Sequence, residues 1–274
     1  MRALALALAL TAAATLACGT AATTGDADAG VTVERKLIEV SGKAALHPAA
    51  LAWLGAKKLA VPTLAGATVA AADPTRALQS LPPLAQATLG ADLSFDLKNV
   101  DVTNVRLGLI TEVVDAAGAS GPVLDTGFGV ARGQPQAALT AQTAWAVPRS
   151  FGEALDGAVG MRPGALLGDG YVLGMVRDAA NAPVSGAVVI NADNGEKLAE
   201  CTSAPEPPCI WYVDATIAGL VTGGTSASGL FLLPYAGNPA NYTARQASRV
   251  FPKKLAGSRA DAVLVLFIDE GASD

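Results

Sequence analysis

The sequence predicts an all-β protein with two tandem antiparallel β-sandwiches and one short connecting helix. Short apolar runs recur along the chain and are separated by turn-forming residues, with 29 Gly and 16 Pro among 274 residues. Hydrophobic residues make up 51% of the chain, which is enough to bury a core. The order of turns and strands in the first half recurs in the second half, and this repetition indicates two related units.

The chain begins with a pattern typical of a secretory signal peptide, residues 1–17. Arg2 supplies the positive charge, and residues 3–17 carry no charge. This apolar run is shorter than the roughly 20 residues that a membrane-spanning helix needs. We therefore expect export and cleavage rather than a permanent membrane span.

Cys18 and the residues before it resemble a bacterial lipobox, because a small residue, Ala17, precedes the cysteine. The resemblance implies that Cys18 is the first residue of a mature lipoprotein, carries a lipid such as palmitate and attaches the protein to a membrane. Thr15 stands where the lipobox favours Leu. Ordinary signal cleavage within residues 12–17 is therefore the alternative, and it would give an exported protein without an anchor.

Residues 18–30 are small and polar and have no hydrophobic period. Linkers of this composition are flexible, so we expect a tether that holds a folded body away from the membrane. Gly19 occupies the position where some lipoproteins of the inner membrane carry Asp. This resemblance favours the outer membrane of the cell envelope. It leaves undecided whether the protein is on the periplasmic face or the surface face of that membrane.

The first, divergent sandwich is expected over residues 31–147. Segments rich in β-branched residues and partly alternating between apolar and polar predict its strands. These segments are residues 31–34, 37–42, 65–70, 91–97 and 105–114. A loop rich in Ala and Leu is expected before the third of them.

A connecting segment, residues 148–167, is expected to contain the one short helix. Phe151, Leu155 and Val159 are spaced four apart, as on one face of a helix. Ser150 and Glu153 stand three residues apart and predict a capping box, with Ser150 as the cap.

The second sandwich is expected over residues 168–274, where the strand patterns are strongest. Its predicted strands are residues 171–177, 184–190, 230–233, 242–245 and 262–268. The last of these is apolar throughout, which predicts a strand that is buried on both faces or packed centrally.

The second half resembles a carboxypeptidase regulatory-like, or transthyretin-like, domain. The matching residues are Gly174, Val176, Asp178, Pro183, Gly186, Ala187, Val189, Gly229, Phe231 and Leu233. A fainter copy of the pattern runs from Gly42 through Gly66 to Phe95 and Leu97. The resemblance implies two prealbumin-like sandwiches, and it implies a fold rather than a chemistry. Gly66 and Gly186 are expected at turns that open strands, where a side chain would clash or restrict φ.

Cys201 and Cys209 flank a Pro-rich loop and form an even pair once Cys18 is assigned to lipid. In an oxidising compartment a disulfide between them is expected, and two unpaired thiols are the alternative. A zinc site is disfavoured because zinc needs about four ligands and His47, the one histidine, is far away in sequence.

Charge and motifs exclude several classes of function. The formal net charge is −5 and Lys and Arg form no cluster beyond pairs, so nucleic acid is not expected as a partner. His47, followed by Pro48, would have to serve any Ser or Cys nucleophile, and the common hydrolase and phosphate-loop motifs do not occur. Residues 191–196 faintly resemble a calcium loop, but a hairpin turn at Asn194 and Gly195 is favoured. We therefore expect no catalytic residue, cofactor or metal.

The function expected from these features is a non-enzymatic cell-envelope lipoprotein for adhesion, scaffolding or ligand binding, with a protein or a glycan as partner. The alternative is a secreted carbohydrate-binding accessory module or a hydrolase. Trp211 and Tyr212 follow Cys209 in a strand pattern, so they point to opposite faces. One of the two is expected to be buried, and the other is a candidate for an exposed recognition surface, with core packing as the alternative.

Overall fold

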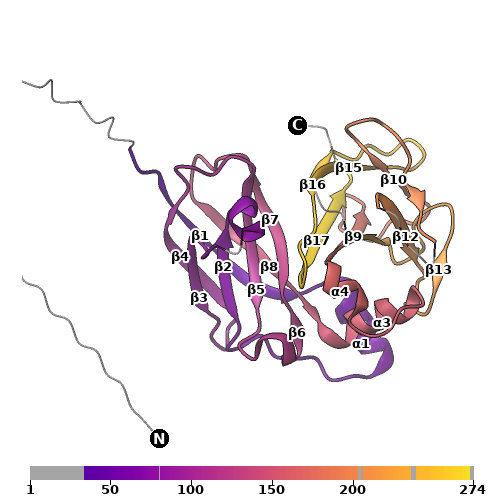
Figure 1. Cartoon of the computed structure of the whole chain (residues 1–274), viewed down its shortest axis with the longest axis horizontal. Coiled ribbons are helices and arrows are strands. Elements are labelled where there is room, and N and C mark those ends of the chain that lie inside the picture. The colour runs from indigo at the N-terminus through magenta and orange to yellow at the C-terminus, as the bar shows by residue number, and fades with distance from the viewer. Residues whose placement is uncertain (1–33, 80, 203–204, 206, 236–238, 272–274) are drawn as a thin grey trace, which may run out of the picture. The chain divides into compact units, whose positions relative to one another are not determined.

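The computed structural model describes residues 34–79, 81–202, 205, 207–235 and 239–271. Strands dominate these residues, which confirms the all-β class (Figure 1). The predicted signal peptide, Cys18 and the tether lie outside the described residues, so these features remain predictions from the sequence.

The largest sheet contains ten strands from both halves of the chain. Its order is β11 (Ala199–Glu200), β12 (Cys209–Val213), β14 (Leu230–Pro234), β9 (Tyr171–Arg177), β17 (Val263–Asp269), β7 (Thr126–Arg132), β5 (Gly108–Val114), β2 (Thr68–Ala72) and β3 (Ala85–Thr88), with β13 (Leu220–Val221) paired to β12. The pairing of β17 with β7 joins the two halves. The sheet thus continues across the predicted connecting segment, and the domain boundaries themselves stay a prediction.

Two smaller sheets complete the sandwiches. One has the order β4 (Ser94–Asp101), β1 (Leu37–Leu46), β8 (Leu139–Pro148) and β6 (Val123–Leu124). The other has the order β10 (Val188–Asn191), β15 (Ala240–Arg245) and β16 (Lys254–Ala256). Most strand pairs are antiparallel as predicted, and the structure adds the parallel pairs β1–β8, β11–β12, β17–β7 and β17–β9. In three of these pairs long stretches of chain separate the strands, as parallel pairing requires, whereas β11 and β12 are joined by the short loop between Glu200 and Cys209.

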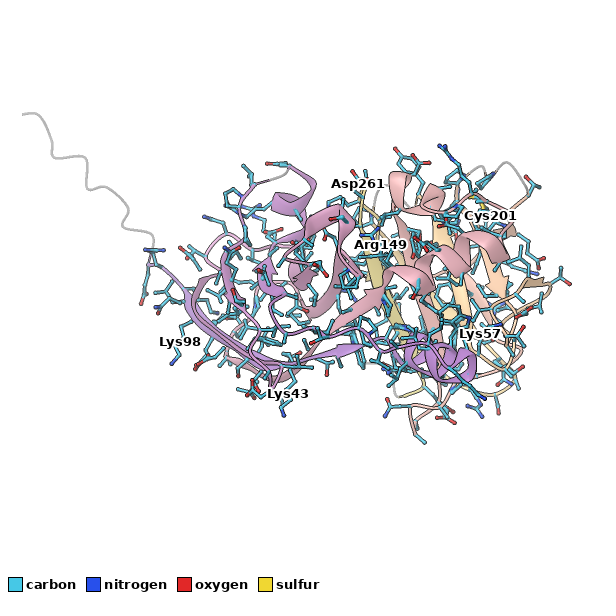
Figure 2. The ribbon with its side chains drawn as sticks, turned by 90° about the horizontal axis from the view of Figure 1, so that it is seen from below. Lys43, Lys57, Lys98, Arg149, Cys201 and Asp261 are labelled. Carbon is cyan, nitrogen blue, oxygen red and sulfur yellow. A yellow bond between two sulfur atoms is a disulfide. The ribbon has the colours of Figure 1, made fainter. Side chains whose placement is uncertain are left out.

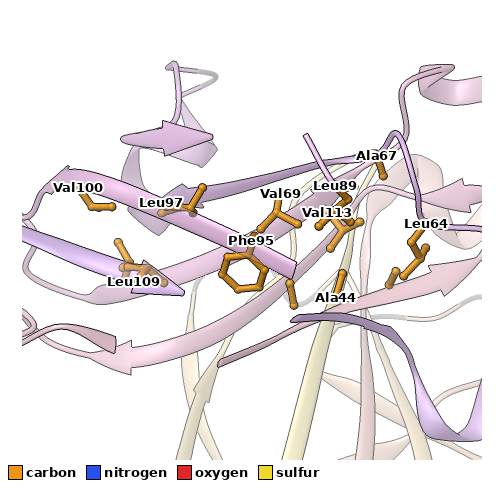
Figure 3. Close-up of a cluster of buried hydrophobic side chains, with 14 of the residues drawn as sticks. Ala44, Leu64, Ala67, Val69, Leu89, Phe95, Leu97, Val100, Leu109 and Val113 are labelled. Carbon is orange, nitrogen blue, oxygen red and sulfur yellow. The ribbon is translucent and has the colours of Figure 1, made fainter. Parts of the chain in front are cut away.

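The first sandwich buries a core between the four-stranded sheet and the β7-to-β3 end of the large sheet. Phe95 and Leu97 of β4 face Val69 of β2 and Val113 of β5 across this core (Figure 3). All four side chains are at most 5% exposed. Alternation of buried and exposed residues along β4 produces this apolar face, as the period of two predicts.

The second half has three layers. The three-stranded sheet covers one face of strands β12, β14, β9 and β17, and a core that includes Val176, Val189 and Phe231 lies between them. Helices α1 (Pro48–Lys57), α3 (Arg149–Ala158) and α4 (Ala165–Asp169) contribute to the core on the opposite face. Because both faces are covered, strand β9 is buried from Tyr171 to Val176, with no polar face.

The helices differ from the single one expected. Helix α3 confirms the predicted connecting helix, and Phe151 and Leu155 on it are fully buried. The predicted cap is wrong, because β8 passes directly into the helix and Pro148 precedes it, so that Ser150 lies inside the first turn. Helices α1, α2 (Pro74–Leu78) and α4 were not expected, nor was a short 3-10 turn, Gly118–Ser120.

Candidate functional site

Strand β17 has a hydrogen-bonded neighbour on both sides for only part of its length. It pairs with β9 from Val263 to Asp269, whereas its pairing with β7 covers Val263 to Val265. On its other edge β7 pairs with β5 from Thr126 to Arg132, and no other described strand pairs with β17 on the β7 side. Residues 266–269 of β17 therefore have a free edge.

A cleft with a volume of about 360 Å³ opens beside this free edge. We call it the β7–β17 cleft. Strands β5 and β7 line one side, β17 lines the base, and residues 253–259, which include β16, line the other side. Pro74 and Ala77 of α2 also line it, as do Leu107, Pro239 and Ala262. Elements from both halves of the chain thus build one concave site.

The free edge of β17 presents backbone hydrogen-bonding groups to the cleft. The N–H of Val263 donates to the C=O of Asp125, on the β7 side, at 2.8 Å. Backbone groups of a strand alternate between its two edges, so the odd-numbered residues of β17 face β7. Phe267 and Asp269 lie beyond the last pair with β7, and both line the cleft. Among the described strands, none pairs with their N–H and C=O groups on that side.

Two glycines of β7 keep the cleft open. Gly127 and Gly129 are alternate residues of one strand and share a face. A Cβ added at Gly127 would lie 3.2 Å from Cδ1 of Leu264 in the base, and a Cβ at Gly129 would meet nothing within 4 Å. A large side chain at Gly129 would therefore occupy open space over the same face of the sheet.

Positive charges outnumber negative charges on the walls. The charged residues that line the cleft are Arg132, Lys253, Lys254, Arg259, Glu112 and Asp269. Both acids are already paired, Glu112 with Arg259 at 2.9 Å and Asp269 with Arg177 at 2.7 Å. The other three cations form no ion pair within 4.0 Å with a described acid. On a chain of formal net charge −5, the cleft is a locally cationic region.

One further carboxylate lies near this region. Asp193 accepts hydrogen bonds from the backbone and side-chain amides of Asn241, and these bonds lower the pKa of Asp193. The positive charges of Lys253 and Arg132 lower its pKa further. Asp193 therefore balances part of the charge of these two residues.

The cleft also has an apolar lip and an unpartnered hydroxyl. Leu107 and Leu255 line it and are 40% and 36% exposed. Ser258 is 8% exposed, and its Oγ has no hydrogen-bond partner in the described structure. An apolar surface with a few convergent polar groups is typical of a binding site.

His47 lies in a different place and cannot serve as an accessible base. Its side chain is fully buried and stacks on Phe267, with ring centroids 5.3 Å apart. Neither ring nitrogen has a hydrogen-bond partner. Burial, with a smaller contribution from the charge of Arg177, lowers the pKa of His47 to about 3. The ring is thus a neutral part of the core beneath α1.

The predicted disulfide between Cys201 and Cys209 is present, with Cα atoms 5.0 Å apart. Cys201 is marked in Figure 2. Of the two interpretations left open for the aromatic residues beside it, core packing is the correct one. Trp211 and Tyr212 are 3% and 1% exposed, because the helices cover one face of β12 and the three-stranded sheet covers the other.

Residues 191–196 form the predicted turn. The N–H of Gly195 donates to the C=O of Asn191 at 2.8 Å, and Gly195 has a φ of 76°. Within the described ranges, no group of three or more His, Cys, Asp or Glu residues is arranged to hold a metal ion.

Sequence reasoning missed the β7–β17 cleft. Its strongest local signal is the pair Gly127 and Gly129 inside a strand, because glycine there often marks a close approach of another chain or ligand. No local sequence pattern indicates that β17 pairs with β9 over a longer stretch than with β7.

The fold and the cleft define an all-β protein with a small, partly apolar and cation-lined cleft beside the free edge of β17. No protein-family model matches the chain, and no curated protein matches it in sequence. Among solved structures, the chain is similar to the shaft pilin spaA from Lactobacillus rhamnosus GG, with 12% identity and a TM-score of 0.25 over 86% of this chain and 99% of the pilin.

Two further solved structures show the same kind of likeness. The minor pilin GBS52 of Streptococcus agalactiae has 9% identity and a TM-score of 0.26, over 85% of this chain and 95% of that one. The Bacillus anthracis TIE protein has 8% identity and a TM-score of 0.23 over 85% of this chain, which spans 34% of that protein's length. Likenesses this weak say nothing about function.

In the described part of the chain, no helix is both long and apolar enough to cross a membrane.

Proposed function

We propose that this protein is a non-enzymatic, exported component of the cell envelope that binds a ligand in the β7–β17 cleft. The observation that carries the proposal is the cleft itself, where a free strand edge, exposed Leu107 and Leu255 and unpaired cations meet. Adhesion or scaffolding requires such a contact surface on a stable body. His47 is neutral and fully buried, so it cannot exchange protons with a bound substrate, and this supports a binding role over acid–base catalysis.

The proposal includes an N-terminal lipid at Cys18 and attachment to the outer membrane. The apolar residues 3–17 and the lipobox-like segment before Cys18 support it. The resemblance of residues 168–269 to a carboxypeptidase regulatory-like domain belongs to the same proposal, because such domains supply structure rather than catalysis.

The alternative carbohydrate-binding module would use a row of exposed aromatic side chains. Within the described part of the chain, Tyr235 is the one exposed aromatic, and it does not line the cleft. The observations therefore favour the cleft over an aromatic platform as the contact surface.

Binding to printed glycan and peptide arrays tests the proposed function. The full chain is compared with Gly129→Phe, which fills the cleft, and with Gly55→Phe as the matched control. Gly55 lies on the exposed side of α1, and a Cβ there would meet nothing within 4 Å. We expect array signals that Gly129→Phe abolishes and Gly55→Phe retains. Array signals that are unchanged in both variants, or the absence of any signal, would contradict binding in the cleft.

Mass spectrometry of the protein from membrane fractions tests the anchor. We expect a diacylglyceryl or acyl modification on an N-terminal Cys18, and release of the protein from the membrane in the variant Cys18→Ser. An unmodified Cys18 in the mature protein would refute lipidation and leave export by ordinary cleavage.

A further inference from the structure

We infer that the ligand of the β7–β17 cleft is an extended peptide with acidic side chains, which adds a short strand along the free edge of β17. This inference rests on the proposed function and specifies the chemistry of its ligand. It follows from three features of the cleft: the unpaired backbone edge, the glycines of β7 and the charge of the walls.

The backbone edge favours a strand over a compact ligand. Phe267 and Asp269 direct their N–H and C=O groups toward the β7 side, where the pairing has ended. An added strand satisfies such groups through main-chain hydrogen bonds, which is how peptides bind to exposed sheet edges generally. The free edge spans residues 266–269, so a strand of about four residues, roughly 13 Å long, fits it.

The glycines of β7 provide room for this strand. A side chain at Gly129 would project from the same face as Gly127, which approaches Leu264 of the base. The absence of a Cβ at both positions leaves the space over this face of β7 open beside the free part of β17. Exposed Leu107 and Leu255 at the lip can contact apolar side chains of the peptide.

The charge of the walls selects the side chains. Arg132, Lys253 and Lys254 have no ion pair with a described acid, while the two lining acids are already paired. Carboxylates on one face of an inserted strand would meet these cations, and lysines there would meet like charge. The unpartnered hydroxyl of Ser258 adds a donor and acceptor on the same wall.

Binding of three synthetic peptides to the full chain tests the inference by fluorescence anisotropy. The first is a capped pentapeptide that alternates Val and Asp, the second replaces each Asp with Lys, and the third carries the acidic sequence with N-methyl groups on alternate amides. We expect the acidic peptide to bind at least about tenfold more tightly than the other two, with weakening as salt is added.

Variants locate the binding and separate the two proposals. Gly129→Phe should abolish binding of the acidic peptide, Gly55→Phe should not, and Lys254→Glu should weaken it several-fold. Equal binding of the N-methylated peptide would overturn strand addition, and equal binding of the Lys peptide would overturn the charge preference. If no peptide binds while array signals still depend on Gly129, the inference falls and the proposed function stands. If nothing depends on Gly129, both fall.

Discussion

Substitution of Gly174 should strongly destabilise the protein, because this residue is in contact with a buried ring. Gly174 of β9 pairs with Phe231 of β14. A Cβ at Gly174 would lie 2.0, 2.2 and 2.4 Å from three atoms of that ring. The ring is fully buried in the core beneath the three-stranded sheet, so it cannot swing into solvent.

The expected cost of Gly174→Ala follows from this overlap. Inserting atoms into a packed core costs typically about 1–3 kcal/mol, and the closeness of these contacts places Gly174→Ala near the upper end. Replacing Phe231 with Leu should remove the clashing atoms and restore part of the loss. The double variant should therefore be more stable than the sum of the single effects predicts, by about 1–2 kcal/mol.

Chemical denaturation monitored by circular dichroism measures these free energies of unfolding. Gly157→Ala in α3 is the control, since a Cβ there meets nothing within 4 Å and alanine favours a helix by about 1 kcal/mol over glycine. A loss below about 0.5 kcal/mol for Gly174→Ala, within the range of ordinary surface changes, would refute the packing argument. Additive effects of Gly174→Ala and Phe231→Leu would refute the proposed clash.

Three other predictions concern stability. Replacing Cys201 and Cys209 with Ser should lower the free energy of unfolding by about 2–3 kcal/mol, because the disulfide closes a short loop with a sequence separation of 8. An unchanged denaturation midpoint would contradict this stabilising effect of the disulfide. The depressed pKa of His47, about 3, means that the unfolded state binds the extra proton, so stability should fall as pH drops below about 6.5 toward 3. His47→Phe should flatten that part of the pH profile, and an unchanged slope would contradict burial of a neutral ring. Asp156 accepts hydrogen bonds from two backbone N–H groups at the start of α4, at 2.7 and 2.9 Å. Asp156→Ala should therefore lower the free energy of unfolding by about 1–3 kcal/mol. Asp156→Asn keeps one acceptor and should lower it less in the same assay.

Much of the fold could be predicted because its strands carry local signals. The predicted strands at 171–177 and 230–233 correspond closely to β9 and β14, where apolar residues form a continuous run. Gly66 and Gly186 adopt positive φ values of 89° and 73°, as expected for turns that open strands. A Cβ at either position meets nothing within 4 Å, so conformation rather than crowding requires glycine there.

Helix α1 shows why other parts could not be predicted. Its sequence is rich in Ala and Leu, and it was expected to be a loop between strands. Ala50 is buried in one core with Phe151 and Leu155 of α3, which lie about 100 residues later in the chain, and Trp53 contacts the ring of Phe151. Tertiary packing supplies most of the stability of a short helix, and a pattern read along one segment does not contain that information.

The β7–β17 cleft is the strongest case of this limit. The sequence correctly indicates that the last apolar run is a strand buried on both faces, and residues 263–269 form that strand. Burial of its faces says nothing about its edges, which depend on how far each neighbour extends. Strand β9 follows β17 to Asp269, while β7 is paired with it only to Val265. The later part of β7 has a register shift in its pairing with β5. The cleft therefore arises from unequal pairing of three strands that are remote in sequence, and no pattern within residues 266–269 indicates which edge of β17 is free.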